Sequence, residues 1–413
     1  MTFRSKKPEL LAPAGGMDQL AFAVHFGADA VYCACDRFGL RQRAANFALS
    51  DMPAAISYAH DAGVRVYVTL NAAMTGEDVA CLPAYLEALA EAGADAFIMS
   101  DMGAVRMARR YAPAAAIHIS TQASCMNAES ALAWHELGAK RIVCAREMSV
   151  ADIAAMRADL PDEIELEAFV HGAMCMAVSG RCLISDHLNA RSANRGHCTQ
   201  PCRWTYALVE QTRPDERFAI EEDEGGSFIL SSKDLNMLHH LDDLAKAGID
   251  SIKIEGRVKK AYYVATVVNA YRQVLDGADP CEFDRDLEAV SHRPYSTGFF
   301  YGPAEQAPSG PEYEQTHALA ATVLSCSPRE DDLYDVVVDL RNRFFEGDLL
   351  EVLSPGEPVR SLIVSELRHV RSSEGDCVAE TEEPVQVADR ATERYVLACS
   401  FRLNPMDILR VER

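Results

Sequence analysis

The sequence predicts an α/β protein: a (β/α)8 barrel of the TIM type that carries a cysteine-rich insertion, followed by a small all-β barrel domain. Over the first 260 residues, short apolar runs alternate with alanine-rich helical stretches, and glycines close the helices. From about residue 316 the pattern changes to short strands separated by Pro, Gly and acidic turns. We therefore expect the barrel in residues 1–312, its insertion at about 172–232, and the β domain at 313–413.

The barrel strands are expected in eight apolar, β-branched runs. In order they are Glu9–Ala12, Ala30–Cys33, Arg65–Leu70, Ala96–Ser100, Ile117–Ser120, Arg141–Cys144, Ile164–Val170 and Ser251–Glu255. The helices between them include Met17–Phe26, Pro53–Ala62, Leu82–Ala92, Ala131–Leu137 and Leu235–Ala247. Four helix-to-strand joints read alike, and we expect a left-handed C-cap glycine in each, at Gly27, Gly93, Gly138 and Gly248.

A repeated strand–helix unit predicts a parallel sheet, and a length of about 250–300 residues favours a closed barrel. The alternative is an open, doubly wound sheet, which usually has a G-x-G-x-x-G loop after its first strand. Here the corresponding APAGGMD contains Gly15 and Gly16 without that spacing, so a dinucleotide site is weakly supported.

The composition limits the class of protein. No apolar run approaches the roughly 20 residues that span a bilayer, and the N-terminus lacks an apolar region of signal-peptide length. We expect a cytoplasmic protein without a membrane partner, whose 13 cysteines are thiols or metal ligands. The net charge of −22 argues against non-specific binding to nucleic acid. Residues 171–205 nevertheless hold four arginines and one acid, which is typical of either an anion-docking site or a solvated loop.

Polar residues follow nearly every predicted strand. In order they are Pro13–Gly15, Asp36, Asn71, Asp101, Gln122, Glu147, His171 and Arg257. Each alone is more often a helix cap or a loop residue. Because the carboxyl ends of barrel strands meet on one face, the full ring predicts a polar pocket there.

The segment after the seventh strand is too long for an ordinary connection, so we interpret residues 172–232 as an insertion on the catalytic rim. Its second part predicts a β-hairpin formed by Tyr206–Glu210 and Phe228–Ser231. The C-terminal domain is expected to contain the strands Ala321–Cys326, Leu333–Leu340, Leu349–Leu353, Ser361–Leu367 and Tyr395–Ala398.

Four cysteines crowd the first part of the insertion: Cys175, Cys182, Cys198 and Cys202. Their spacings, C-x6-C, C-x15-C and C-x3-C, are wider than the tight pairs typical of structural zinc sites. An iron–sulfur cluster held by four cysteines tolerates irregular spacing. The residues themselves favour an iron–sulfur cluster over zinc or ordinary thiols, and all three remain open.

The run ELEAFVHGAMCMAVSGRCLIS resembles the signature of the collagenase-like peptidase family U32. Other matching runs are ELLAPAG at 9–15, FGLRQRAANF at 38–47, HISTQ at 118–122, SSKDL at 231–235 and IKIEGR at 252–257. The resemblance covers essentially the whole chain. Within the family, GHCTQPCRW resembles the bacterial branch that hydroxylates tRNA.

This resemblance implies a function. Members of the branch make 5-hydroxyuridine at the tRNA wobble position without molecular oxygen, with prephenate as the implicated hydroxyl source. They carry a 4Fe-4S cluster on four cysteines, which correspond here to Cys175, Cys182, Cys198 and Cys202. The expected partners are the tRNA anticodon loop and prephenate. The alternatives are a U32 peptidase, with Zn at the same cysteines, or a hydroxylase of another RNA or of a ubiquinone precursor.

We assign candidate roles on this basis. The candidate catalytic residues are His171, Asp101 and Glu147, at strand ends. The candidate substrate-binding residues are Arg41, Asn46, Gln122, Arg203 and Arg257. Arginines are chosen for the two carboxylates of prephenate because a guanidinium binds a carboxylate in a bidentate manner. Arg41 and Arg257 are the first choices, and Arg146 and Arg203 are weaker candidates. Trp204 is expected either to stack on a base or to pack in the core.

Overall fold

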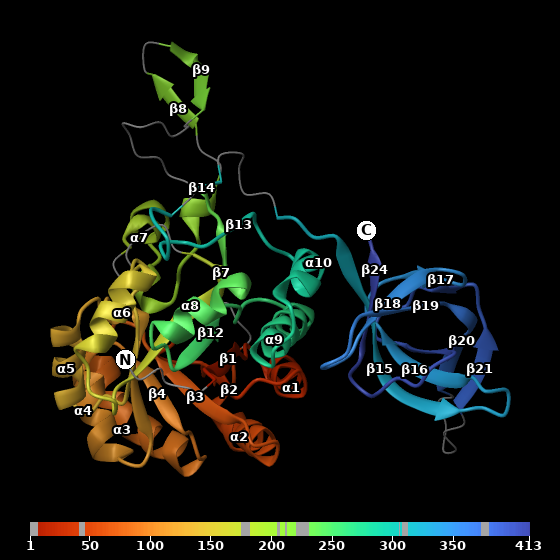
Figure 1. Ribbon diagram of the computed structural model, residues 1–413, viewed down its shortest axis with the longest axis horizontal. Coiled ribbons are helices and arrows are strands. Elements are labelled where there is room, and N and C mark those ends of the chain that lie inside the picture. Colours follow the sequence, from red (N-terminus) through yellow and green to blue (C-terminus); the bar gives the residue numbers. More distant parts are fainter. Residues whose placement is uncertain are drawn as a thin grey trace.

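An eight-stranded parallel barrel and an antiparallel β domain make up the structure, which is a computed structural model (Figure 1). It describes residues 7–40, 46–174, 182–204, 207–210, 213–219, 231–304, 306–307, 313–372 and 380–413. Among these residues, no helix is both long enough and apolar enough to cross a membrane.

The barrel closes through its first and last strands. Its strands are β1 (Glu9–Pro13), β2 (Ala30–Cys33), β3 (Arg65–Leu70), β4 (Ala96–Met99), β5 (Ala116–Ile119), β6 (Arg141–Val143), β7 (Glu165–Ala173) and β12 (Ser251–Ile254). Each pairs in parallel with the next, β12 pairs with β7, and β1 pairs with β12. The predicted eight-stranded parallel barrel is therefore confirmed, and an open sheet is ruled out.

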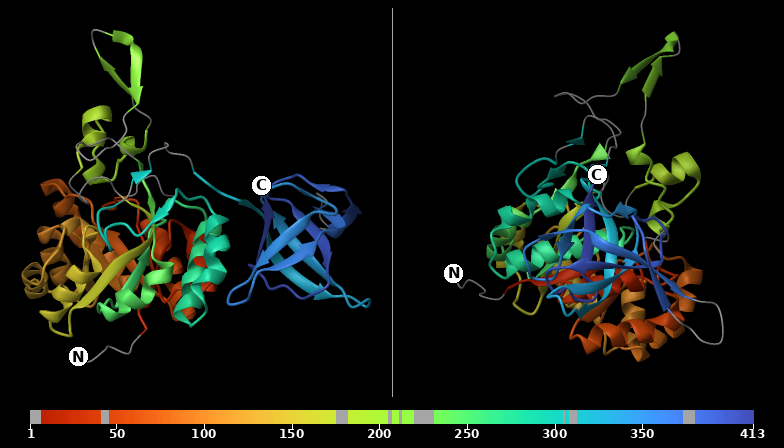
Figure 2. Two further views of the ribbon diagram at one scale, coloured as in Figure 1. Left: turned by 45° about the horizontal axis from the view of Figure 1, so that its top comes forward. Right: turned by 90° about the vertical axis from the view of Figure 1, so that its right-hand side faces the viewer.

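Helices cover the outside of the barrel (Figure 2). They are α1 (Met17–His25), α2 (Met52–Asp61), α3 (Gly76–Glu91), α4 (Met102–Tyr111), α5 (Ala128–Glu136), α6 (Val150–Ala158), α8 (Leu241–Lys246) and α9 (Ala261–Leu275). The four predicted C-cap glycines all have left-handed φ angles, between 86° and 101°. α3 and α5 begin earlier than predicted, because Thr75 and Asn127 cap them through their side chains.

The helix predicted at Leu235–Ala247 is wrong in its first half. Residues Asp234–Asn236 instead form a strand, β11, which pairs antiparallel with the extension of β7 and parallel with β13 (Tyr295–Ser296). Asp234 also forms a buried ion pair with Arg293, at 2.6 Å. These tertiary contacts override a local helical pattern, and the helix proper is the short α8.

The insertion contains α7 (Ile184–Asn189) and a two-stranded hairpin of β8 (Ala207–Glu210) and β9 (Arg213–Ala219). The predicted first hairpin strand is thus present, but its predicted partner is wrong. Within the predicted second strand only Ser231 is described, and it begins β10 (Ser231–Ser232), which pairs with β14 (Gln306–Ala307). The immediate neighbour Arg213–Ala219 pairs instead, because a short connection costs less loop entropy.

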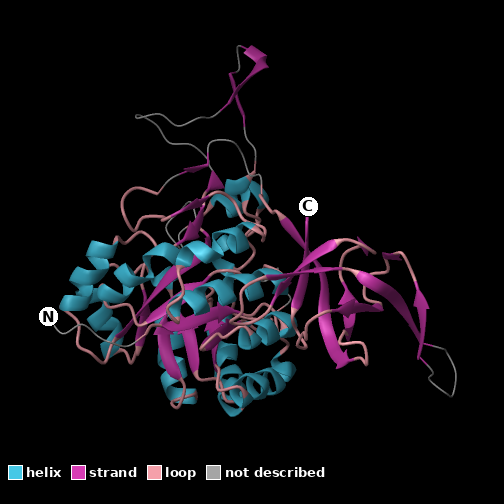
Figure 3. Ribbon diagram, turned by 45° about the vertical axis from the view of Figure 1, so that its right-hand side comes forward, coloured by secondary structure: helices cyan, strands magenta, loops and turns pink. Residues whose placement is uncertain are grey.

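The C-terminal region is antiparallel and all-β, as predicted (Figure 3). Its sheet has the order β19 (Arg360–Ile363), β18 (Leu349–Leu353), β24 (Ile408–Glu412), β15 (His317–Pro328), β16 (Tyr334–Leu340), β23 (Arg394–Cys399), β20 (Ser365–Ser372) and β21 (Glu380–Pro384). The predicted strand Ser361–Leu367 is two strands, since Val364 leaves the ladder and its N–H donates to Asp348 O.

A buried arginine joins the two parts. Arg410 of β24 is 1% exposed, and its guanidinium contacts Asp286 of α10 (Asp284–Glu288) at 2.5 Å and Glu351 of β18 at 2.8 Å. Leu353 and Ile408 of the β domain also belong to the apolar core of the barrel. The β domain is therefore packed against the barrel side and not connected by a linker alone.

Two glycines allow the loops at the barrel mouth to pack closely. A Cβ on Gly15 would lie 2.0 Å from the carbonyl oxygen of Arg257. A Cβ on Gly172 would lie 2.4 Å from the carbonyl oxygen of Glu255, and Gly172 also has a φ of +98°. The ends of β1, β7 and β12 approach one another only because no side chain stands between them.

We expect Gly172→Ala to destabilise the barrel by at least about 3 kcal/mol, because it combines left-handed strain with a steric clash. Gly63→Ala is the matched control, since Gly63 has a φ of +75° and open space around it. That control should cost only about 1 kcal/mol. Urea unfolding followed by far-UV circular dichroism measures both; equal losses would contradict the packing argument.

Candidate functional site

Polar side chains line the carboxyl-terminal mouth of the barrel. Inward positions alternate along each strand, so Thr69 and Asn71 continue the inward face of β3. Asn71 Nδ2 donates to Gln122 Oε1 at 3.0 Å and to Ser120 Oγ at 3.3 Å. Arg257, which follows β12, is 4% exposed, and its Nη1 donates to Thr69 Oγ1 at 3.1 Å. Asn71 and Gln122 thus contact each other, and Arg257 contacts Thr69 of β3, whereas the polar pocket itself stays a prediction.

Arg146 is a second buried cation at this mouth. Its side chain is 7% exposed, and its guanidinium lies 3.9 Å from the centre of the Phe169 ring. Nη1 donates to Ala173 O at 2.8 Å, whereas Nη2 is 3.7 Å from Glu255 Oε2, beyond hydrogen-bond distance. Nε is buried and has no hydrogen-bond partner among the described residues. The Nε–Nη2 edge of this arginine therefore has unused donors.

Charged residues also fill the barrel below the mouth. Arg141 of β6 contacts Glu9 at 2.6 Å and Glu167 at 3.0 Å, and Lys253 of β12 contacts Glu167 at 2.9 Å. Burial would raise the pKa of Glu9, but Arg141 and Arg65 outweigh burial and lower it. Burial lowers the pKa of Lys253, and Glu167 opposes this. These buried charges compensate one another and hold the four strands together.

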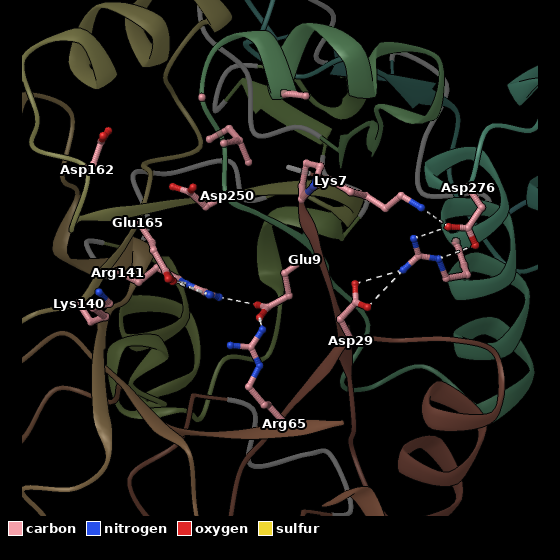
Figure 4. A pocket seen from close by; sticks show the side chains of 15 residues that line it. Lys7, Glu9, Asp29, Arg65, Lys140, Arg141, Asp162, Glu165, Asp250 and Asp276 are labelled. Atoms are coloured by element: carbon pink, nitrogen blue, oxygen red, sulfur yellow. Dashed lines mark hydrogen bonds and ion pairs between the residues drawn. The ribbon is translucent and has the colours of Figure 1, made fainter. Parts of the chain in front are cut away.

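The lower end of this network opens on a cavity of about 890 Å³ at the amino-terminal face (Figure 4). Glu9 lies between the guanidinium groups of Arg65 and Arg141. Arg272 forms ion pairs with both Asp29 and Asp276. Each of these charged groups has a partner of opposite sign. Because its charges neutralise one another, we assign this face to stability.

The described cysteines of the insertion lie in one hydrogen-bonded unit. Cys182 precedes α7, Cys198 Sγ accepts from Gln200 N at 3.3 Å, and Cys202 lies in the 3-10 helix Pro201–Arg203. All three are partly buried. Thr199, beside Cys198, accepts from Asn189 at 3.0 Å, and its N–H donates to Ser185 Oγ at 3.1 Å, so α7 and the second cysteine segment are joined.

Cys175 lies outside the described residues, and within the described ranges no group of three or more His, Cys, Asp or Glu side chains is placed to hold a metal ion. The four-cysteine site therefore stays a prediction. The donor set itself suits it, since thiolates are the ligands of iron–sulfur clusters and of zinc. The unit also stands where the prediction requires, because Ala73, which follows β3, donates to Asn194 O at 2.8 Å.

His171, near the carboxyl end of β7, is buried in an aromatic cluster. It is 1% exposed, its Nδ1 is 3.3 Å from Tyr271 Oη, and its ring contacts Tyr263 and Tyr295. Burial lowers its pKa to about 3, so the imidazole is neutral at pH 7. Its predicted catalytic role has no further support from these contacts.

The other predicted residues differ in their surroundings. Asp101 caps α4, where Oδ1 accepts from Ala104 N at 2.9 Å, whereas Glu147 has a buried Oε2 without a partner among the described residues. Asn46 has a left-handed φ of 48°. Arg41 and the side chain of Arg203 lie outside the described residues. Trp204 is 47% exposed, so the core-packing alternative for it is wrong.

The charged residues within the barrel strands are not among the predicted site residues. Glu165 and Glu167 in β7, and Lys253 and Glu255 at β12, occur two residues apart. Such spacing places both members of a pair on the same face of a strand. Alternating charges in an otherwise apolar strand were therefore the available signal for a charged barrel interior.

Two family models match this chain. The family model described as "Peptidase family U32" matches residues 15–309, and its C-terminal domain model matches residues 315–410. Residues 15–309 include the mouth residues Asn71, Gln122, Arg146 and Arg257 and the whole insertion.

Three relatives are informative. The chain is 39% identical to "tRNA hydroxylation protein P1" of Bacillus subtilis, with 85% of this chain and 84% of the relative covered. It is 34% identical to "tRNA hydroxylation protein P" of Escherichia coli, with 90% and 91% covered. It is 36% identical to "23S rRNA 5-hydroxycytidine C2501 synthase" of Escherichia coli, with 67% and 40% covered.

We expect His171 to make stability fall in acid. Below pH 6.5, the ordinary pKa of histidine, His171 of the unfolded chain binds a proton. In the folded chain the same imidazole stays neutral until the pH approaches 3. The free energy of unfolding should therefore lose about 1.4 kcal/mol per pH unit from this group between pH 6.5 and pH 3. Denaturation at several pH values measures the slope, and His171→Phe should remove this component. An identical slope in both proteins would contradict a buried neutral histidine.

Proposed function

The chain belongs to peptidase family U32, and on that premise we propose that it hydroxylates RNA, converting the wobble uridine of tRNA to 5-hydroxyuridine. The observation that carries the proposal is the likeness to two tRNA hydroxylation proteins over 85–90% of the chain, at 34–39% identity. The rRNA hydroxycytidine synthase among the relatives supports the same chemical class, hydroxylation at C5 of a pyrimidine in RNA.

A 4Fe-4S cluster bound by Cys175, Cys182, Cys198 and Cys202 would supply the redox chemistry that protein side chains lack. Three of these cysteines belong to the described part of the insertion, which contacts the loop after β3. Zinc at the same thiols is the competing ligand and belongs to the peptidase alternative.

Arg146 and Arg257 are proposed to bind the two carboxylates of prephenate. A guanidinium binds a carboxylate side-on through Nε and Nη2, and this edge of Arg146 has unused donors. Phe169 beneath the guanidinium and Ala173 O at its far end hold the side chain in place. Ala173 is two residues before Cys175, so a carboxylate on Arg146 would lie near the cysteine segment.

The RNA side of the site is proposed to use Trp204. Its ring is half-exposed and lies two residues after Cys202, where a uridine taken out of the anticodon loop would stack on it. Glu147 remains the candidate acid–base group, because its buried Oε2 is unpartnered among the described residues. Asn71 and Gln122 offer amide groups that suit hydrogen bonds to a uracil edge.

We expect Cys182→Ala and Cys198→Ala each to abolish 5-hydroxyuridine, since each removes a cluster ligand. The test is mass spectrometry of tRNA nucleosides from a strain that lacks this gene and any paralogue, complemented with each variant. Cys81→Ala is the control, because Cys81 is exposed and lies on α3, outside the insertion. Unaltered 5-hydroxyuridine in the deletion strain, together with peptide cleavage by zinc-loaded protein, would establish the peptidase instead.

We expect Arg146→Lys to raise the KM for prephenate by roughly 10- to 100-fold, because lysine keeps the charge but cannot form the two parallel hydrogen bonds. Steady-state hydroxylation of a tRNA substrate by anaerobically purified protein measures it. Arg157→Lys is the control, since Arg157 donates to backbone carbonyls of Leu160, Pro161 and Ile164, away from the mouth. A KM unchanged by Arg146→Lys would remove Arg146 from the substrate site.

A further inference from the structure

The cysteine-bearing unit is attached to the barrel by a small set of polar contacts. Ala73, in the loop between β3 and α3, donates its N–H to Asn194 O at 2.8 Å. Arg195 Nη1 donates to Ala73 O at 3.2 Å and to Asp78 Oδ2 at 3.0 Å. Residues 194–195 of the insertion and residues 73–78 of the barrel thus form a joint, which we call the clasp.

The barrel half of the clasp is held rigidly. Asp78 is the third residue of α3, and its Oδ2 accepts from Thr75 N at 2.8 Å and from Thr75 Oγ1 at 2.7 Å. Hydrogen bonds from the Thr75 backbone N–H and hydroxyl lower the pKa of Asp78 to about 2, and Arg195 contributes to the same shift. The carboxylate is therefore ionised at every pH at which the protein works, and the capping box fixes its position.

The insertion half leads directly to the cysteines. Arg195 ends a 3-10 helix that closes at the left-handed Gly196, and His197 N donates to Ser192 O at 2.9 Å. Cys198 follows, and its neighbour Thr199 is hydrogen-bonded to Ser185. A displacement of Arg195 would therefore move Cys198 and, through Thr199, the segment that begins at Cys182.

We propose that Arg195 is a positioning residue: together with Asp78 it clasps the cysteine-bearing unit onto the β3–α3 loop and sets its cysteines above the polar residues of the barrel mouth. The loop that it grips begins at Asn71, which is itself a mouth residue. This inference rests on the proposed function for its catalytic meaning, but the docking itself is independent of it.

The clasp positions the unit more than it stabilises the fold. The Arg195 side chain is 42% exposed and that of Asp78 is 20% exposed. An ion pair so open to water contributes little to global stability and weakens with salt. Loss of Arg195 should therefore leave the unfolding transition of the barrel unchanged and alter only the local opening of the joint.

Hydrogen–deuterium exchange on the full-length, metal-free protein tests the docking directly. In Arg195→Ala the amide of Ala73 and those of residues 194–199 should exchange about two- to fivefold faster, as expected for a lost exposed ion pair. Arg195→Lys should restore part of the protection, since an ammonium can reach the same two oxygens. Arg191→Ala is the matched control, because Arg191 is exposed and its side chain has no partner among the described residues. Exchange in Arg195→Ala that equals the wild type, or an equal increase in Arg191→Ala, overturns the clasp.

Hydroxylation kinetics test the positioning role. Arg195→Ala should lower kcat and leave the KM for prephenate unchanged, because Arg146 and Arg257 remain in place. Faster exchange with an unchanged kcat would refute positioning. A wild-type protein that protects Ala73 through Arg195 but makes no 5-hydroxyuridine would refute the proposed function and leave the docking established.

Discussion

The rest of the structure depends on the buried charges that tie the barrel closed. Arg141 of β6 reaches Glu9 of β1 and Glu167 of β7, and Glu167 in turn holds Lys253 of β12. TIM barrels more often fill this space with branched apolar side chains. A buried ion network tolerates no slip in strand register, because a shift would leave a charge uncompensated at a cost of about 3–5 kcal/mol. The network therefore fixes which strand ends meet at the mouth.

With the register fixed, the carboxyl ends of β3, β6 and β12 bring together groups that are far apart in the sequence. Arg257 reaches Thr69, and Arg146 reaches both Ala173 and Glu255. The same face receives the cysteine unit, which contacts the loop after β3. The two faces of the barrel therefore differ. At the amino-terminal face the charges neutralise one another, whereas at the mouth some buried donors and acceptors have no hydrogen-bond partner among the described residues and could bind a ligand.

Local patterns predicted the elements well where local and tertiary preferences agree. The eight strands could be predicted from apolar runs alone. The four C-cap glycines could be predicted because glycine adopts the left-handed conformation more easily than other residues. The failures occurred where a distant partner decided the structure. Leu235 joins a strand because the extended β7 offers it hydrogen bonds at Gly172. His171, whose catalytic role stays a prediction, lies among tyrosines of α9. Neither partner lies near enough in the sequence to have been inferred.

The sequence by itself determined the fold class, the resemblance to family U32 and the crowding of four cysteines in one insertion, because each is written in a contiguous run of residues. Only the tertiary structure decided that Arg146 has a buried Nε without a hydrogen-bond partner among the described residues, that Asp101 serves as a helix cap, and that Arg195 meets Asp78. These roles depend on which side chains converge in space. Convergence is set by barrel closure, which joins residues more than a hundred positions apart.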